Sequence, residues 1–499
     1  MPAEPTHSRS DWIALYVLCV GMLMIVLDGT IVNVALPSLK SDLEFSDTGL
    51  AWVLNAYLIA FGGLLLLGGR IGDLIGQRKM FLLGMAIFTV ASVLCGLAQS
   101  QGMLIGARFL QGVGGALGSS VILAMIVTIF REPQAQAKAL GVYGFVASAG
   151  GSLGLLLGGV LTDAISWHWI FFVNVPIGAA TLALAWRLVP DRPGIGLHHG
   201  ADIRGAALLT GGLMLGVYAI LGVEQYGWGA TRTLVLAAVA IILLATFLRR
   251  QTRVAEPLMP LRLFRSRNVS GANVIQALLV AGMFGLFFFG ARYLGEVLGY
   301  TPIEVGLAFL PGTALIGLMS LRVAEPLMMR FGPRAVLIPG LTSLLLALLW
   351  FSRTPVDGSY VVDVLPSMVL FGIGAGISFP PIMTLAMSGA TPQDSGLASG
   401  LVNTAMQMGG AIGLAVLATF AADHKASELA SGLSETEALN AGFHLAYLIG
   451  AGLLALAIVI AAVVMHAPAP HPVTDGDGSD PRDDADRLVA PALVGAEAD

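Results

Sequence analysis

The chain has 499 residues, of which 56% are hydrophobic and 11% are charged, and its mean hydropathy is +0.83. A soluble domain would carry about 25% charged residues, so this composition excludes an ordinary set of soluble domains. The formal net charge of −5 says little about partners, because the charges lie in loops and in an acidic tail.

Fourteen apolar stretches follow one another along the chain, each long enough to cross a bilayer as a helix of about 20 residues. At this hydrophobicity only helices satisfy their backbone polar groups in lipid, because a barrel would need short alternating strands. We therefore predict an all-α membrane protein with 14 transmembrane helices, at 12–36, 48–68, 80–98, 103–129, 138–162, 169–189, 203–223, 232–249, 269–290, 303–322, 334–352, 362–388, 396–421 and 442–465.

The basic residues predict how these spans are oriented. Of the 26 Lys and Arg residues, Arg108 lies inside a span and five lie on one side of the membrane, namely Lys40, Arg232, Arg292, Arg353 and Lys425. All the others lie on the opposite side, most densely in the loop 250–268. Cytoplasmic loops retain Lys and Arg, so we predict a multi-pass protein of a bacterial inner (plasma) membrane with both termini in the cytoplasm.

An internal repeat divides the chain. The run Gly150–Leu155 in span 5 resembles Gly409–Leu414 in span 13. Two further strings recur at nearly the same offset, since Gly112–Gly114 resembles Gly372–Gly374 and Ile75–Arg78 resembles Phe331–Arg334. Two similar halves with a site between them near the midplane are typical of secondary transporters. We predict a cytoplasmic N-terminus, an N-terminal six-helix bundle, an insertion with spans 7 and 8, a pseudo-symmetric C-terminal six-helix bundle and a disordered acidic cytoplasmic tail, at 1–11, 12–189, 190–268, 269–465 and 466–499.

Two full charges fall well inside spans, Asp28 in span 1 and Arg108 in span 4. At 1.5 Å per residue, Asp28 lies roughly 13 Å from the outer end of its span near Pro37, and Arg108 lies about 8 Å from Met103. Because unpaired buried charges are costly, we predict that they pair. An intramembrane carboxylate is a functional candidate that could exchange a proton, and a purely structural ion pair is the alternative.

The loop between spans 2 and 3 reads GRIGDLIGQRK. Glycines there permit close approach and positive φ, and its carboxylate can cap or face a helix N-terminus. An ordinary positive-inside loop is the alternative, but the whole string closely resembles the cytoplasmic-loop signature of the major facilitator superfamily. The resemblance implies a clasp that closes the cytoplasmic side, formed by Gly69, Arg70, Gly72, Asp73, Gly76, Arg78 and Lys79.

Three further strings resemble motifs of that superfamily, the second its span-4 motif and the other two those of its fourteen-span drug:proton antiporter family. They are LDGTIVNVALP from Leu27, RFLQGVG from Arg108, and WHWIFFVNVPIG from Trp167 with His168 in place of an arginine. In the family the acidic residue is associated with coupling or with cationic substrates, and the arginine with proton transfer. The resemblance therefore implies that Asp28 and Arg108 couple transport to protons.

Span 5 carries a ladder of small residues that lets helices pack closely. The ladder resembles the family's antiporter signature, which ends G-P-x-x-G-G, except that Leu155 replaces the proline. That signature separates exporters from importers, so the departure leaves an importer open. The helix-packing residues predicted for this antiporter motif are Gly150, Gly151, Gly154, Gly158 and Gly159.

Polar residues inside other spans predict a possible substrate cavity, with bridging between helices as the alternative. They are Asn33, Asn55, Tyr57, Gln111, Asn273, Gln276, Asn403 and Gln407. In span 12, Pro380 and Pro381 predict a break in the helix.

Neither a nucleotide-binding loop nor a catalytic or metal-binding motif appears in a supporting context. We therefore predict no enzyme activity, no catalytic residue, no metal, no cofactor and no nucleic-acid partner. A potential of about 100 mV supplies about 2.3 kcal/mol per charge, enough for a roughly 40-fold gradient per proton.

The predicted function is secondary active export of a drug, antibiotic or other amphiphilic small molecule in exchange for protons, by alternating access, in a protein that works in the bilayer as a monomer. A proton-coupled importer or symporter on the same fold is one alternative. A membrane receptor or scaffold without transport is another.

Overall fold

The computed structural model describes residues 9–130, 133–194, 196, 202–254, 257–259, 261–388 and 395–465. The predicted tail 466–499 lies outside the described residues. The first helices are α1 (Arg9–Asp42), α2 (Asp47–Ile75), α3 (Gln77–Gly96), α4 (Gln101–Ser119), α5 (Ile122–Ile129), α6 (Pro133–Ala164), α7 (Trp169–Phe172) and α8 (Asn174–Leu188). They are followed by α9 (Ile203–Leu221), α10 (Val223–Tyr226), α11 (Thr231–Gln251) and η2 (Leu261–Arg265).

The remaining helices are α12 (Arg267–Arg292), η3 (Tyr293–Val297), α13 (Pro302–Leu318), η4 (Met319–Val323), α14 (Ala324–Phe331), α15 (Pro333–Phe351), η5 (Tyr360–Val364), α16 (Leu365–Met387), α17 (Ser395–Ala430) and α18 (Glu435–Val463). Within the described part of the chain, 13 helical stretches are long and apolar enough to cross a bilayer, and the apolar segment Leu153–Ala164 of α6 falls at the remaining predicted span. The all-α membrane fold class is confirmed, and the number of spans agrees approximately with the 14 predicted.

Several helices extend beyond the predicted spans. Helix α1 continues through Pro37 to Asp42, so its outer end lies further from Asp28 than predicted. Helix α18 begins seven residues before the predicted 442, because Ser434 and Glu437 form a capping box there.

The predicted break at Pro380 and Pro381 is wrong, because both prolines lie inside the continuous helix α16. A proline at 380 cannot donate to the carbonyl of Gly376, four residues earlier. Ser320 Oγ donates to that carbonyl instead, at 2.8 Å. A hydroxyl on a neighbouring element thus satisfies the backbone that proline leaves unpaired, as transmembrane helices allow.

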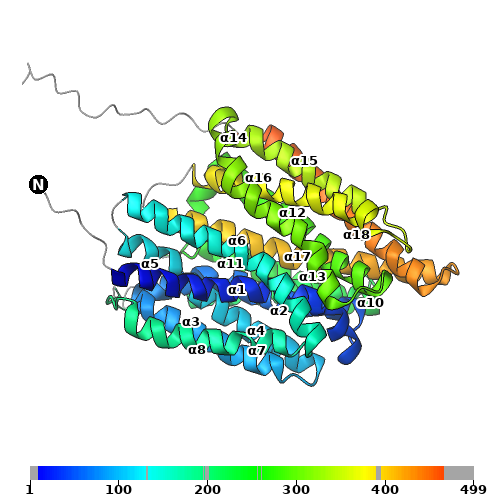
Figure 1. Cartoon of the computed structure of the whole chain (residues 1–499), viewed down its shortest axis with the longest axis horizontal. Coiled ribbons are helices and arrows are strands. Elements are labelled where there is room, and N and C mark those ends of the chain that lie inside the picture. Colours follow the sequence, from blue (N-terminus) through cyan, green and yellow to red (C-terminus); the bar gives the residue numbers. More distant parts are fainter. Residues whose placement is uncertain are drawn as a thin grey trace, which may run out of the picture. The chain divides into compact units, whose positions relative to one another are not determined.

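The helices lie side by side along a roughly common direction (Figure 1). In the first part of the chain α1 packs on α6 and α8, and α4 packs on α2 and α3. In the last part α12 packs on α17 and α18, and α16 packs on α13 and α15. The main contacts between these groups join α2 to α17 and α6 to α13, while α9 packs on α11, α2 and α17. The packing agrees with two bundles and an inserted helix pair, although the domain boundaries stay a prediction.

One turn recurs in both halves. Gly76, between α2 and α3, has φ +107°, and Gly332, between α14 and α15, has φ +82°, a region that glycine enters without strain. Two residues after each glycine an arginine follows. Arg78 donates to a backbone carbonyl in the last turn of α8, and Arg334 donates to two carbonyls in the last turn of α18. Corresponding spans are therefore tied together in the same way.

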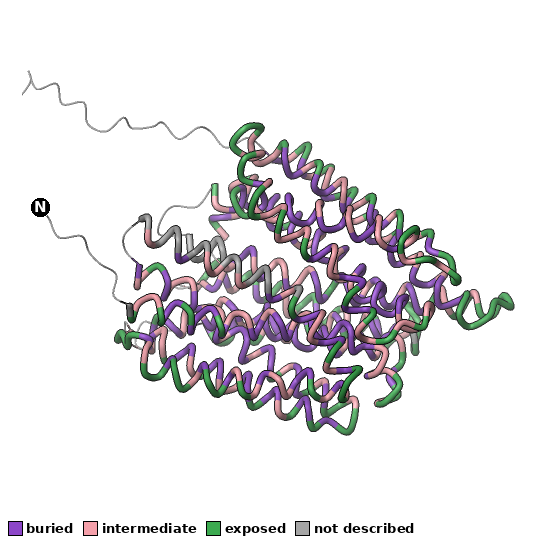
Figure 2. Tube along the Cα trace, viewed as in Figure 1, coloured by how far each residue is buried: buried purple, intermediate pink, exposed green. Residues whose placement is uncertain are grey.

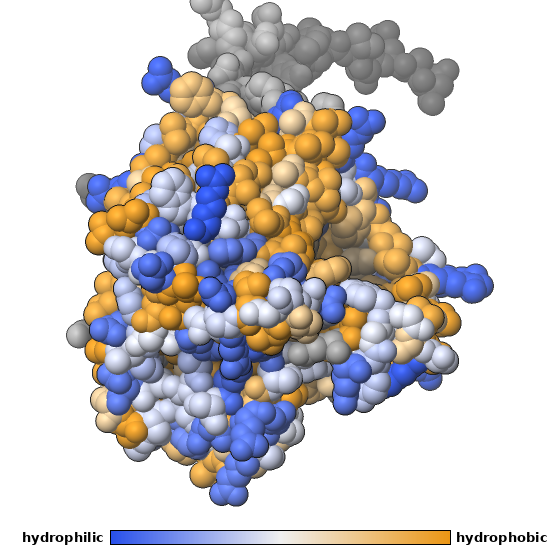
Figure 3. All heavy atoms as spheres, turned by 90° about the vertical axis from the view of Figure 1, so that its right-hand side faces the viewer, coloured by the Kyte–Doolittle hydropathy of each residue, from blue (hydrophilic) through white to orange (hydrophobic). Residues whose placement is uncertain are grey.

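Burial follows from this packing. Figure 2 shows long buried stretches through the helices and exposed residues towards their ends. Seen from the end of the bundle, hydrophilic side chains cover much of the surface beside hydrophobic flanks (Figure 3). Helix α11 exposes large apolar side chains, among them Leu234 (57%), Ile241 (66%) and Ile242 (62%). Exposed apolar flanks and polar ends are what a multi-pass membrane protein presents to a bilayer.

Candidate functional site

The two charges predicted to pair inside the membrane are in contact. Arg108 Nη1 lies 2.5 Å from Asp28 Oδ2, and both side chains are fully buried. Asp28 comes from α1 and Arg108 from α4. The attraction between the two charges offsets part of the cost of taking them out of water.

Three polar side chains surround this pair. Gln111 and Asn174 both donate to Asp28 Oδ1, at 2.7 and 3.0 Å. Gln111 also donates to Ser92 Oγ at 2.8 Å and accepts from Arg108 at 2.6 Å. The carboxylate is therefore held by donors on α4 and α8 at once, which orients it within a connected network.

The guanidinium of Arg108 lies under two aromatic rings. Its carbon atom is 4.5 Å from the centre of the Tyr57 ring and 5.8 Å from that of Phe171, distances at which a cation is attracted to a ring face. Arg108 Nε also donates to the carbonyl of Val53 at 3.0 Å. Its Nη2 atom has no hydrogen-bond partner in the part of the chain that the structure describes.

Small residues bring these helices close enough for the contacts. Arg108 and Gln111 are three residues apart and share one face of α4. On the following turn a Cβ at Gly112 would lie 2.4 Å from the carbonyl oxygen of Tyr57 on α2, so only glycine fits. The sequence pattern from Arg108 to Gly114 thus both supplies the polar groups and permits the approach.

The glycine ladder of α6 contacts both halves. A Cβ atom added at Gly154 would lie 2.7 Å from the carbonyl oxygen of Leu27, and one added at Gly158 would lie 2.6 Å from the carbonyl oxygen of Ile31. At Gly159 it would lie 2.6 Å from the Pro302 carbonyl oxygen of α13. Gly150 also packs on α1, whereas Gly151 has no such neighbour within 4 Å. Close packing is therefore observed at four of the five predicted positions. Leu155, in place of proline, is buried within the ladder.

The loop 69–79 is held by its own half of the chain. Arg78 donates to the carbonyl of Trp186 and lies 3.8 Å from Asp191. Asp73 accepts from Gln77 at 3.4 Å, and the N-cap of α3 is Gly76 without a side-chain cap. Of the two roles predicted for Asp73, capping a helix N-terminus or facing one, the cap is not observed, because α3 begins at the turn at Gly76 without a side-chain cap.

The remaining residues of this motif lie around that turn. Gly72 packs against Val121, because a Cβ atom added at Gly72 would lie 2.4 Å from the Val121 side chain. Lys79 is exposed, and Gly69 and Arg70 lie on the last turns of α2. A clasp to the other half stays a prediction.

An ion cluster that the sequence patterns did not predict lies where five helical elements meet on the predicted outer side. Lys40 Nζ lies 2.8 Å from Asp47 Oδ1 and 2.9 Å from Glu296 Oε2. Arg292 Nε lies 2.6 Å from Glu296 and the same side chain pairs with Asp47. Lys425 lies 3.2 Å from Asp47. These five residues, the outer ion cluster, join α1 and α2 to α12, η3 and α17. Lys40, Arg292 and Lys425 are three of the five basic residues on the predicted outer side. Their presence on a side that is poor in Lys and Arg was the signal in the sequence from which the cluster could have been predicted.

The predicted cavity residues are dispersed. Tyr57 and Gln111 belong to the Asp28–Arg108 network, Asn33 and Asn273 donate to carbonyls of their own helices, and Gln407 packs against Gly62 of α2. Asn55 and Gln276 are buried and Asn403 is half-buried. Both amide atoms of Asn55 lack a partner among the described residues.

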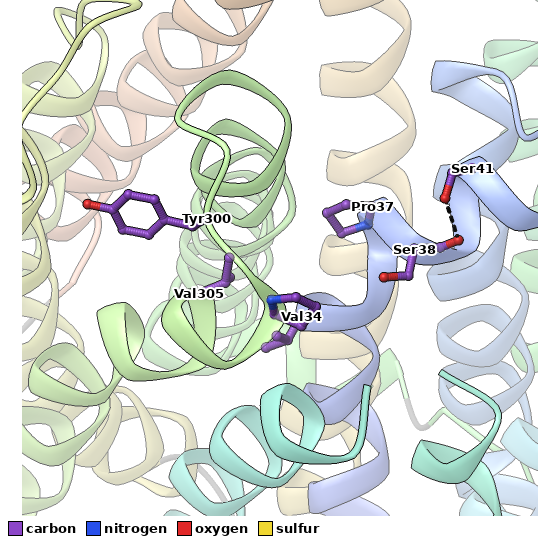
Figure 4. Close-up of a pocket in the computed structure, with 7 residues that line it drawn as sticks. Val34, Pro37, Ser38, Ser41, Tyr300 and Val305 are labelled. Carbon is purple, nitrogen blue, oxygen red and sulfur yellow. Dashed lines mark hydrogen bonds between the residues drawn. The ribbon is translucent and has the colours of Figure 1, made fainter. Parts of the chain in front are cut away.

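A pocket of about 230 Å³ lies between α1 and the start of α13, where Pro37 and Ser38 face Val305 (Figure 4). None of the eight predicted cavity residues lines this pocket.

Known proteins resemble this chain along most of its length. Residues 18–414 match the model of the Major Facilitator Superfamily. The chain is 38% identical over 460 residues to the puromycin resistance protein pur8 of Streptomyces alboniger, covering 91% of each chain. It is 37% identical over 459 residues to the cephamycin export protein CmcT of Amycolatopsis lactamdurans, covering 91% of this chain and 93% of that one.

Solved structures share the fold. An auto-inhibited POT family peptide transporter superposes with a TM-score of 0.66 at 16% identity, covering 93% of this chain and 99% of the other. The protein is thus a multi-pass membrane transporter of small molecules and not an enzyme. The chain belongs to the Major Facilitator Superfamily.

Proposed function

We propose that this transporter exports an antibiotic or another amphiphilic small molecule in exchange for protons, across a bacterial plasma membrane with both termini in the cytoplasm. The relatives named for puromycin resistance and cephamycin export support export. The observation that carries proton coupling is the fully buried ion pair between Asp28 and Arg108.

The geometry suggests how a proton would act. Protonation of Asp28 removes the charge that faces Arg108, and leaves Arg108 with the neutral acceptors Val53 O and Gln111 Oε1. A buried charge that loses its partner costs about 3–5 kcal/mol. Protonation therefore favours a movement of α1 against α4 that gives Arg108 other partners, and a substrate that displaces the proton reverses it.

The outer ion cluster supplies a second part of this mechanism. Its contacts join the outer ends of α1 and α2 to those of α12 and α17. Outward opening by rocking of the two bundles, 12–189 and 269–465, has to break these contacts. In our proposal the cluster stabilises the state closed on the outer side, and the protein works as a monomer.

The test is substrate-induced proton release in inverted membrane vesicles, with a panel of dyes and antibiotics that includes puromycin. We expect release by the wild type, none by Asp28→Asn, and normal release by the matched control Asp163→Asn, because Asp163 is exposed on α6. Full activity of Asp28→Asn would remove Asp28 from the mechanism.

An importer on the same fold is the second candidate, which Leu155 leaves open because the exporter signature has proline there. Vesicle uptake distinguishes the two directions. An exporter accumulates the compound in inverted vesicles with an acidic interior, whereas an importer coupled to protons accumulates it in right-side-out vesicles with an acidic exterior.

A further inference from the structure

A groove lies between α9 and α11 at the ends predicted to face the cytoplasm. Its volume is about 800 Å³, within the range of about 300–1,000 Å³ typical of ligand sites. The walls are made by Ala207 and Leu208 of α9, Thr246 of α11 and Val254 after it, and the remaining lining residues are four arginines, Arg204, Arg249, Arg250 and Arg253.

One of these arginines is neutralised within the protein. Arg250 Nε lies 2.6 Å from Asp202 Oδ1. Burial opposes ionisation of Asp202, but hydrogen bonds from Arg250, Gly205 N and Gln251 outweigh it and hold the pKa of Asp202 below its usual value. This partly buried contact also fixes the end of α11 against the start of α9.

The other three arginines are exposed at the groove and have no ion-pair partner in the part of the chain that the structure describes. Arg204 lies one turn before Leu208 on α9, Arg249 lies in the last turn of α11, and Arg253 lies two residues after the end of that helix. All three side chains line the groove, so their charges lie beside its apolar walls. Such a concentration of positive charge favours the binding of an anion.

The surface next to the groove indicates where that anion comes from. Helix α11 exposes Ile241, Ile242 and Leu248 along the same helix, at 66%, 62% and 46%, as a lipid-facing helix does. The groove therefore continues a surface that contacts acyl chains. Basic pockets between transmembrane helices on the cytoplasmic side bind anionic lipid headgroups.

We propose that the α9–α11 groove is a binding site for an anionic phospholipid of the cytoplasmic leaflet. The phosphate contacts Arg204, Arg249 and Arg253, and an acyl chain lies along Ala207, Leu208 and Val254. The site anchors the helix pair inserted between the two halves, and does not depend on the proposed direction of transport or on proton coupling.

The test measures lipid retained by the purified full-length protein, by native mass spectrometry during titration with phosphatidylglycerol. The variant Arg204→Gln/Arg249→Gln/Arg253→Gln should bind it more weakly, by about fivefold per arginine and on the order of 100-fold in total. The matched control Arg187→Gln/Arg322→Gln/Arg330→Gln removes three arginines that are exposed on the same predicted side, and should bind like the wild type.

A second variant tests the groove itself. Ala207→Trp keeps every arginine but fills the space between the helices, so it should also lose phosphatidylglycerol. Equal binding by the wild type and both groove variants would overturn the proposal, as would an equal loss in the control. Competition by inorganic phosphate as effective as that by phosphatidylglycerol would show a soluble-anion site and overturn the lipid assignment, and equal retention of phosphatidylcholine would overturn the role of charge.

Discussion

The outer ion cluster makes a quantitative prediction for the substitution Asp47→Asn. Asp47 accepts from Lys40, Arg292 and Lys425, so three cations share two carboxylates in the cluster. Neutralising Asp47 leaves Lys40 and Arg292 with Glu296, and leaves Lys425 with the exposed Glu435 at 3.7 Å. Arg292 is only 1% exposed, so its unbalanced charge is costly, whereas each partly exposed lysine contributes about 0.2–1 kcal/mol.

The lower end of the 3–5 kcal/mol for a broken buried pair applies here, since Arg292 keeps Glu296 as a partner. We therefore expect Asp47→Asn to destabilise the outer-closed state by about 2–4 kcal/mol, which shifts the balance towards the outward-open state roughly 30- to 700-fold.

Electron spin resonance can measure this shift. Spin labels at Gln99 and Ser431, which are exposed at the predicted outer ends of the two predicted bundles, report the distance between those ends. The native cysteines, Cys19 and Cys95, are buried, which favours labelling of the introduced ones. Asp47→Asn should populate longer distances, and the control Glu435→Gln should not, because Glu435 is 81% exposed and 3.7 Å from Lys425. An unchanged distance distribution in Asp47→Asn would refute the role of the cluster as an outer gate.

Three further predictions follow from buried contacts. Arg108→Met should lower the thermal stability of the purified protein by more than the double substitution Asp28→Asn/Arg108→Met does, because the single change leaves a buried carboxylate without its charged partner. Equal losses of thermal stability in the two variants would mean that Asp28 and Arg108 are not energetically coupled. Gly158→Leu should prevent folding or transport, since its Cβ would lie 2.6 Å from the Ile31 carbonyl oxygen, whereas Gly151→Ala should be tolerated. Because the pKa of Asp202 is lowered in the folded protein, the ionised Asp202 stabilises the fold fully above its usual pKa of 3.8, and this stabilisation is lost as the pH falls through the folded-state pKa. The difference in stability between the wild type and Asp202→Asn should therefore shrink in acid. A difference that stays constant with pH would contradict this assignment.

The sequence by itself determined the helices, because apolar stretches of bilayer length can satisfy their backbone only as helices. It also determined the pairing of Asp28 with Arg108, since two charges of opposite sign inside apolar spans at similar depth have few other partners. The repeated turn at Gly76 and Gly332 was visible as a repeated string, because a positive φ restricts the residue type.

Only the tertiary structure decided which neutral side chains join the charged pair. Ser92 and Asn174 look like any polar residue of a span until α3 and α8 pack beside α4 and α1. The outer ion cluster depends in the same way on contacts between helices far apart in the chain, as when Lys40 meets Glu296. The spacing of residues along one helix carries no information about such contacts between helices. A charge inside an apolar span, by contrast, can be recognised in the sequence, and because an unpaired buried charge is costly, the sequence alone predicts that it has a partner.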